Sequence, residues 1–302
     1  MDSQWWKVSR SVSVKQGIRL ALLVGLLQAG CAGKAVETNP INEPEPAQPS
    51  EAAVATSNAV IPAMTPSAEA KLKAAVDAVL VGHDSQIPVS SRASVLKMIH
   101  HLQHHPDARK LVEAALHQAP LYNAKISSLL ERDGLPPELF YIAAAESAFL
   151  SPDLQGKGLA VGLWQMIPST ARHYGLQVNE GVDERKDVFK STDASLRHLV
   201  DLHATFGDWE LVITGFYAGA GIVERGLEMS GATDAWSLIE SPGALPEETR
   251  GYLPLVYAHL IVALDPVRFG FSSNVSDEAL EGLKTNFGHY YTHRYPMDLF
   301  AP

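Results

Sequence analysis

One acidic side chain stands in the otherwise apolar segment Ala143-Ala144-Ala145-Glu146-Ser147-Ala148-Phe149. On a helix, Leu139 and Ile142 share a face with Glu146, and this apolar stripe continues beyond it. Because burial disfavours an ionised carboxylate, the pattern predicts that the pKa of Glu146 is raised. A general acid that works near neutral pH requires such a shift. For an isolated glutamate, the alternative is a side chain turned out to solvent or paired with an arginine.

Helix signals recur along the chain, whereas strand signals are scarce. The prolines of Leu135-Pro136-Pro137-Glu138 suit the first turn of a helix that runs to Glu146. Other helical patterns cover residues 70–81 and 95–102. We expect Ser169 to cap a short helix that Gly175 ends.

Three further helices follow from the same reasoning. We expect Ser191 or Thr192 to cap a helix that stops at Gly207. Another helix begins at Trp209. The last apolar helix carries Tyr252, and Pro254 is expected to kink or restart it. These patterns predict a mainly α protein with a helical N-terminal extension.

The first 30 residues have the pattern of a secretory signal peptide. The apolar run at residues 20–27 is too short to span a bilayer, and it follows a basic segment that contains Lys7, Arg10, Lys15 and Arg19. The run ends at Gln28-Ala29-Gly30-Cys31, which resembles a bacterial lipobox except that Gln28 stands where leucine is usual. Cys31 is the only cysteine, so it suits a lipid attachment point. Ordinary signal cleavage beside an incidental cysteine is the alternative.

The residue after Cys31 bears on location. Ala32 stands where lipoproteins of the inner membrane often carry aspartate, so the lipobox resemblance implies the periplasmic face of an outer membrane.

We expect residues 31–66 to form an extended Pro/Ala/Glu tether, because they have too few apolar groups to offset the entropy of ordering. The remaining divisions are a helical extension at 67–119, a catalytic domain at 120–266 and a tail at 267–302, to which we assign no role.

The formal net charge of −10 argues against a nucleic-acid partner but does not exclude a glycan. Four histidines at positions 100, 101, 104 and 105 invite a metal-site hypothesis, because side chains four residues apart share a helix face. No cysteine and no HExxH pattern accompanies them, so we predict a solvated helix face and no metal. His198 and His203 are five residues apart, which is a poor ligand spacing on a helix.

Several ordered motifs resemble the lytic transglycosylases of the lysozyme-like superfamily, specifically the soluble-type catalytic domain shared with the membrane-bound D group. The resemblance covers about residues 121–265 and implies a lysozyme-like helical catalytic domain there. In chain order, the blocks are Gly134-Leu135-Pro136-Pro137-Glu138-Leu139, Glu146-Ser147, Gly162-Leu163-Trp164-Gln165, Ile167-Pro168-Ser169-Thr170-Ala171, Tyr174-Gly175-Leu176, Val182-Asp183-Glu184-Arg185 with Asp187, Lys190-Ser191-Thr192, and Pro246-Glu247-Glu248-Thr249-Arg250 with Tyr252 and Pro254.

Two departures from the family pattern concern the substrate. Phe216 and Tyr217 stand where an Ala-Tyr-Asn signature supplies tyrosine and asparagine, which removes an amide that would orient the sugar or its peptide-bearing substituent. Gly156 stands where the family usually has serine. A binding-only descendant of the family is therefore an alternative.

The resemblance implies a reaction on peptidoglycan glycan strands. Glu146 would protonate the glycosidic oxygen between N-acetylmuramic acid and N-acetylglucosamine, then accept the proton of the muramoyl 6-hydroxyl, leaving a 1,6-anhydro end. No cofactor or metal is implied. The expected substrate-binding residues are Ser147, Trp164, Gln165, Phe216, Tyr217 and Tyr252. For Ser147 the alternative is a helix-end hydroxyl, for Trp164 a core position, and for Tyr252 a helix-packing position with a surface hydroxyl. A lysozyme-type hydrolase is a further alternative for the whole chain.

Overall fold

The computed structural model describes residues 61–156, 159–292 and 299–300. The expected signal peptide, Cys31 and most of the expected tether lie outside these residues. Among the residues that the structure does describe, every helix is too short or too polar to cross a membrane.

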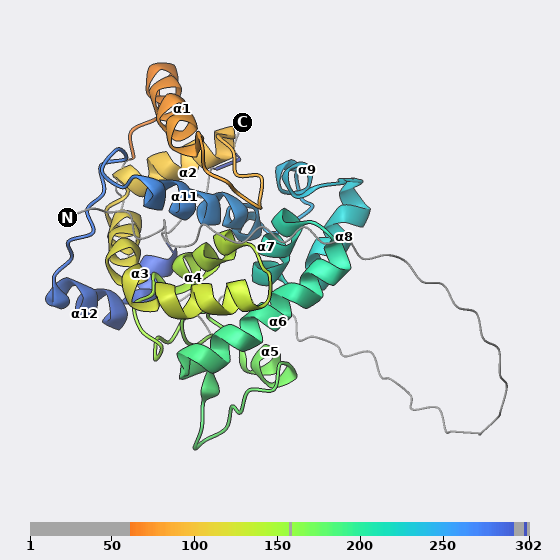
Figure 1. Ribbon diagram of the computed structural model, residues 1–302. Coiled ribbons are helices and arrows are strands. Elements are labelled where there is room, and N and C mark those ends of the chain that lie inside the picture. Colours follow the sequence, from red (N-terminus) through yellow and green to blue (C-terminus); the bar gives the residue numbers. More distant parts are fainter. Residues whose placement is uncertain (1–60, 157–158, 293–298, 301–302) are drawn as a thin grey trace. The chain divides into compact units, whose positions relative to one another are not determined.

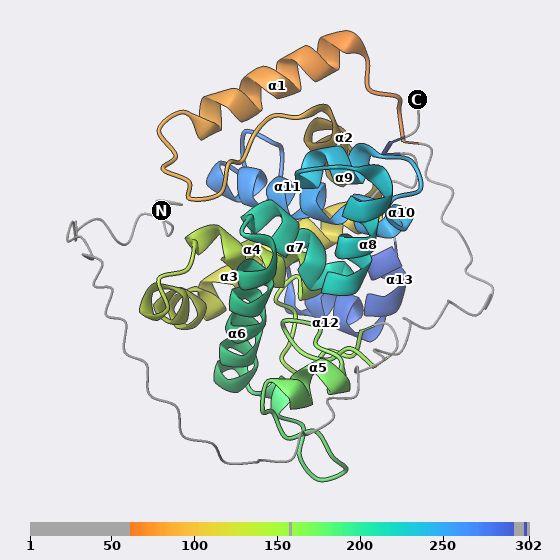
Figure 2. The same ribbon diagram turned by 90° about the vertical axis from the view of Figure 1, so that its right-hand side faces the viewer.

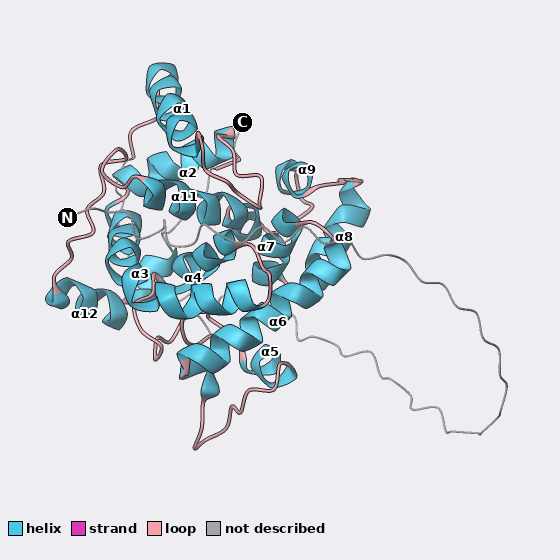
Figure 3. Cartoon of the chain, viewed as in Figure 1, coloured by secondary structure: helices cyan, strands magenta, loops and turns pink. Residues whose placement is uncertain are grey.

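The described chain is built from helices joined by loops, and its pairings in β geometry are isolated bridges such as Val161 with Met166 (Figures 1 and 3). This confirms the mainly α class. The α-helices are α1 (Pro66–Leu80), α2 (Ala93–His104), α3 (Pro106–Arg132), α4 (Phe140–Ser147), α5 (Pro168–His173), α6 (Val188–Phe206), α7 (Trp209–Ala218), α8 (Ala220–Ser230), α9 (Ala235–Glu240), α10 (Glu247–Arg250), α11 (Tyr252–Leu264), α12 (Asp277–Thr285) and α13 (Phe287–Thr292). Two 3₁₀ turns, η2 (Pro137–Leu139) and η3 (Glu184–Lys186), precede α4 and α6.

Helix α11 forms the centre of the core. Every residue from Tyr252 to Ala263 is buried, so this helix has no solvent-facing side. It packs against α2, α4 and α7, and α1 also contacts it (Figure 2). The catalytic-helix candidate α4 and the glycine-containing helix α7 therefore meet on a common apolar support.

The tail packs on the same body. Helices α12 and α13 contact α3, and the side chain of Gln103 donates to the Phe269 carbonyl oxygen over 3.0 Å. Phe287, at the start of α13, is 2% exposed. Together with Ala144 and Ala145 of α4, it lines a small cavity behind that helix. The tail thus contributes to the packing of α4.

Two of the expected helix caps are wrong. Helix α6 begins four or five residues earlier than expected, because the Asp187 carboxylate accepts from the backbone N–H groups of Phe189 and Lys190, each over 2.9 Å. Ser191 lies inside the helix instead. Helix α5 starts at Pro168, whose missing N–H suits a first turn, so Ser169 is an interior residue. Helix α6 does end at Gly207, where φ is +67°.

Pro254 neither kinks nor restarts the last apolar helix. Helix α11 begins at Tyr252, which places Pro254 in its first turn, where a backbone N–H would have no intrahelical partner. The preceding residues form the separate helix α10. The proline is therefore compatible with a straight start to α11.

The histidine group is only half solvated, which corrects the expected solvated face. His101 and His105 are each 5% exposed, and their rings stack with centroids 5.0 Å apart. His105 also caps α3 through its Nδ1 atom, which accepts from the Ala108 N–H. Within the described ranges, no three His, Cys, Asp or Glu side chains are grouped so as to hold a metal ion.

Candidate active site

Glu146 lies in the last turn of α4, where the chain leaves the helix through unusual backbone conformations. Ala148 and Phe149 have φ values of +49° and +53°, and Gln165 has +46°. Among the described residues, these are the three non-glycine positions in the left-handed region. Such backbone strain persists only where surrounding contacts enforce it, and it concentrates at functional sites. Here it flanks both the Glu146-Ser147 motif and the Gly162–Gln165 motif.

Tyr252 holds the carboxyl group of Glu146. Its hydroxyl donates to Glu146 Oε1 over 2.6 Å, and the two side chains are 0% and 4% exposed respectively. The contact joins α11 to α4, so Tyr252 has no surface hydroxyl. Because a phenol donates, it stabilises the ionised carboxylate and leaves the acidic proton to Oε2.

Four carboxyl groups are buried among the described residues, and three of them have structural partners. Glu138 accepts from Ser85 Oγ and the Gln86 N–H, Glu210 accepts from Trp236 Nε1 and the Tyr257 hydroxyl, and Asp107 pairs with Lys110. Glu146 accepts from Tyr252, and both residues belong to motifs of the resembled family. Glu146 is therefore the candidate acid among these four groups.

Tyr217 lies on the outer side of this pair. Its ring stacks on that of Tyr252, with centroids 4.5 Å apart and an interplanar angle of 19°. Tyr217 is partly exposed, whereas Tyr252 is fully buried. The neighbouring Phe216 is also partly exposed. The structure thus brings Tyr217, Tyr252 and Glu146 together in one layered arrangement.

Trp164 is a core residue. It is 1% exposed, and its Nε1 atom donates to Thr192 Oγ1 over 3.0 Å. The edge of its ring contacts Phe216, with centroids 6.2 Å apart. A ring without an exposed face offers no platform for a sugar, so the structure favours the core alternative for this residue.

Ser147 also acts within the protein. Its Oγ lies 2.8 Å from the Leu163 carbonyl oxygen and 3.1 Å from that of Ala143, and it accepts from the Phe149 N–H. The hydroxyl is fully buried. It therefore ties the end of α4 to the turn that carries Trp164 and Gln165.

Gln165 is folded back over Gly156. Its Nε2 atom donates to the Gly162 carbonyl oxygen over 2.6 Å. A Cβ atom at position 156 would lie 1.6 Å from Gln165 Oε1, so a serine there would require the glutamine side chain to move. Glycine at position 156 thus permits this orientation of the partly exposed Gln165 amide.

Arg185 supports the site, although the sequence patterns gave it no role of its own. It is 6% exposed, its guanidinium forms a bidentate pair with Asp183, and its Nη1 donates to the carbonyl oxygens of Leu159 and Met166. The neighbouring Glu184 forms an ion pair with Lys190. The sequence signal for this pair was an arginine two residues after an aspartate, Asp183.

A comparison with family models matches residues 126–239 to the family described as Transglycosylase SLT domain. These residues are thus similar to the transglycosylase SLT domain. The match confirms the resemblance to lytic transglycosylases of the lysozyme-like superfamily. The matched segment includes Glu146 and Gln165 and ends before Tyr252. In the fold, the Tyr252 hydroxyl nevertheless contacts the Glu146 carboxylate.

Curated relatives agree with this assignment. Membrane-bound lytic murein transglycosylase D from Escherichia coli strain K12 is 34% identical over 167 residues, which are 54% of this chain and 36% of the relative. The protein of the same name from strain O6:H1 gives the same values. A protein of Alteromonas sp. (strain M-1), named for tributyltin chloride resistance, is 35% identical over 111 residues, 36% of this chain and 53% of its own. This chain thus spans about a third of the length of the Escherichia coli relatives.

Proposed function

We propose that this protein is a peptidoglycan lytic transglycosylase in which Glu146 acts first as general acid and then as general base. The observation that carries the proposal is the buried Glu146 carboxyl group held by Tyr252 within an SLT domain. The name of the Escherichia coli relative supports the same reaction class and substrate.

The proposed reaction consumes no water. Protonated Glu146 gives its proton to the oxygen that links N-acetylmuramic acid to N-acetylglucosamine, and the bond from the anomeric carbon to that oxygen breaks. The N-acetylglucosamine leaves with a free 4-hydroxyl. Glu146, now ionised, takes the proton of the muramoyl 6-hydroxyl, whose oxygen bonds to the anomeric carbon. The product carries a 1,6-anhydro ring, and Glu146 is again protonated.

The environment of Glu146 suits both halves of this cycle. Burial disfavours the charge, which favours the acid before bond cleavage, while the Tyr252 hydroxyl supports the carboxylate that forms afterwards. We propose that Tyr217, Phe216 and the Gln165 amide contact the sugar. Ser147 then serves as a positioning residue, since its hydroxyl bonds to the backbone.

We further propose that the protein is anchored in the envelope through a lipid on Cys31, at the periplasmic face of an outer membrane. The basic leader, the short apolar run and the sole cysteine support this location. The words "membrane-bound" in the name of the Escherichia coli relative are consistent with it. An anchored enzyme would act on peptidoglycan strands near that membrane.

The test is mass spectrometry of products released from purified sacculi by the wild-type protein and by Glu146→Gln. We expect 1,6-anhydro-muropeptides from the wild type and none from the variant. Products that end only in reducing muramic acid would identify a lysozyme-type hydrolase instead. Retention on sacculi without any release by the wild type would identify a non-catalytic binding lipoprotein.

A further inference from the structure

His198 lies beside the candidate sugar-contacting residues but has no part in the proposed chemistry. On helix α6, its ring lies between Tyr174 and Phe216, with centroid distances of 5.1 Å and 5.5 Å. Phe216 is followed directly by Tyr217, whose ring stacks on Tyr252. His198 is partly exposed, like Phe216 and Tyr217. Its ring therefore contacts Phe216, one of the residues proposed to contact the sugar.

The hydrogen bonds around His198 assign its tautomer. The Tyr174 hydroxyl lies 3.0 Å from Asp201 Oδ2 and 3.0 Å from His198 Nδ1. Because a carboxylate only accepts, the single phenol proton is donated to Asp201. The Tyr174 oxygen then accepts from His198, which places the imidazole proton on Nδ1. The lone pair is left on Nε2, at the opposite edge of the ring from Tyr174.

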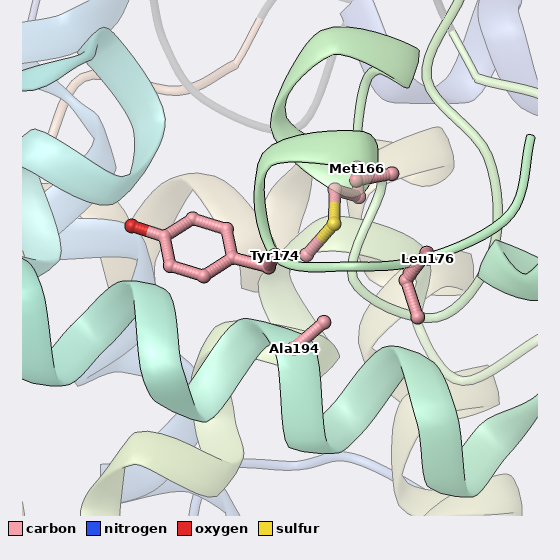
Figure 4. Close-up of a cluster of buried hydrophobic side chains, with 5 residues drawn as sticks. Met166, Tyr174, Leu176 and Ala194 are labelled. Carbon is pink, nitrogen blue, oxygen red and sulfur yellow. The ribbon is translucent and has the colours of Figure 1, made fainter.

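Apolar packing supports this arrangement. The ring of Tyr174 packs with Met166, Leu176 and Ala194 in a buried cluster, and its hydroxyl points away from Met166 and Leu176 (Figure 4). The aromatic body is thus fixed by apolar contacts while the hydroxyl reaches α6. No hydrogen bond joins Nε2 of His198 to another residue in the described part of the chain.

The charge state of His198 suits an acceptor. Burial lowers its pKa to about 4, an effect that His173 reinforces and Asp201 opposes. The imidazole is therefore neutral near pH 7, and a neutral ring with Nδ1 protonated accepts at Nε2.

We infer that His198 is a substrate-binding residue whose Nε2 accepts a hydrogen bond from an amide N–H or hydroxyl of the glycan strand or its stem peptide, with Tyr174 and Asp201 as positioning residues. This inference rests on the proposed function for the identity of the ligand. It adds a polar contact next to Phe216, which has no polar group of its own.

Binding is measured in the Glu146→Gln background, so that turnover does not interfere, with peptidoglycan as the probe. We expect His198→Phe to weaken binding about three- to tenfold, the loss typical of one hydrogen bond. His198→Gln places an amide near the position of Nε2 and should stay within about twofold of the parent. Tyr174→Phe keeps the packed ring but removes the hydroxyl that fixes the tautomer of His198, so it should give an intermediate loss of binding. His203→Gln, on the same helix, is the control and should bind like the parent.

Melting temperatures of the same variants separate binding from folding. Equal binding by the His198→Phe variant and its parent would overturn the inference. So would equal losses in His198→Phe and His198→Gln, because the acceptor would then be irrelevant. Peptidoglycan from which an amidase has removed the stem peptides identifies the donor of the hydrogen bond. If His198→Phe still binds this glycan more weakly than its parent does, the donor lies on the sugar. If the two proteins bind it equally, the donor lies on the stem peptide.

These outcomes are independent of catalysis. If the predicted binding pattern appears but the wild type releases no anhydro product, the His198 contact stands and the proposed reaction fails. If the wild type releases anhydro product while His198→Phe binds and cleaves normally, the reaction stands and this inference fails.

Discussion

The contact between Tyr252 and Glu146 is the smallest unit on which the proposed chemistry depends. One hydroxyl from α11 meets a carboxyl group at the end of α4 over 2.6 Å, with both groups shielded from water. In such surroundings a hydrogen bond to a charged group is worth about 1.5–3 kcal/mol. The bond stabilises the ionised form of Glu146, so Tyr252 contributes mainly to the second half of the reaction, after Glu146 has lost its proton.

Tyr252→Phe should therefore slow release of anhydro product by about 10- to 100-fold. The ring and its stack on Tyr217 remain, so the variant should fold, with a stability lowered by about 0.5–1.5 kcal/mol through loss of one hydrogen bond. Loss of a donor to the carboxylate disfavours ionisation, so the alkaline limb of the pH–rate profile should move to higher pH. A slower enzyme with an unmoved alkaline limb would show that Tyr252 acts through packing alone.

Glu210 shows how a buried acid behaves when its role is structural. It is 6% exposed and accepts hydrogen bonds from Trp236 and Tyr257, and burial is the main cause that raises its pKa. Glu210→Ala leaves two buried donors without an acceptor, each at a cost of about 1–3 kcal/mol. Chemical denaturation should report this loss, with Glu240→Gln as an exposed control.

The pH dependence of Glu210 has a definite sign. Because the pKa of Glu210 is raised above its ordinary value of 4.5, the folded protein keeps this proton at pH values where the unfolded chain has lost it. The contribution of Glu210 to stability therefore falls as the pH rises through the folded-state pKa. Glu210→Gln removes that dependence. Its stability relative to wild type should thus improve as the pH is raised above 4.5; a constant difference would contradict the assignment.

At the scale of elements, helix positions were predictable but several helix starts were not. Apolar periodicity located α4, α6, α7 and α11, because burial of one face dominates their stability. The start of α6 depends on which polar side chain reaches free N–H groups, and Asp187 does so instead of Ser191. Likewise, no pattern distinguished a core Trp164 from an exposed one; its hydrogen bond to Thr192 spans 28 positions and requires the folded chain.

Arg185 connects elements that local sequence leaves unconnected. It bridges the turns around Leu159, Met166 and Asp183, which support the Gly162–Gln165 motif. Arg185→Lys keeps the charge but loses the planar fork, so stability should fall by about 1–3 kcal/mol. Hydrogen exchange should quicken at residues 159–166, and it should not do so in Arg172→Lys, an exposed control. Unchanged exchange in Arg185→Lys would contradict this connecting role.

At the scale of the molecule, the segments outside the SLT match are part of the fold. The sequence suggested no role for the tail, because its aromatic residues lack helical periodicity. In the structure Phe269, Phe271 and Phe287 are 2%, 4% and 2% exposed, and α12 and α13 pack on α3. Such contacts depend on tertiary proximity between distant parts of the chain, which one sequence does not reveal.

Removal of residues 267–302 should therefore prevent stable folding. Each buried phenylalanine contributes about 1.5–3 kcal/mol, so three of them approach the total stability of an ordinary domain, about 5–15 kcal/mol. A cooperative melt near the wild-type temperature, recorded by circular dichroism, would show instead that the tail is dispensable.

The most direct test of the central claim is the product spectrum of purified sacculi treated with wild-type protein and with Glu146→Gln. The account predicts 1,6-anhydro-muramoyl ends from the wild type, and from the variant only binding, because the glutamine can neither donate nor accept the transferred proton. Anhydro ends released at an undiminished rate by Glu146→Gln would contradict it.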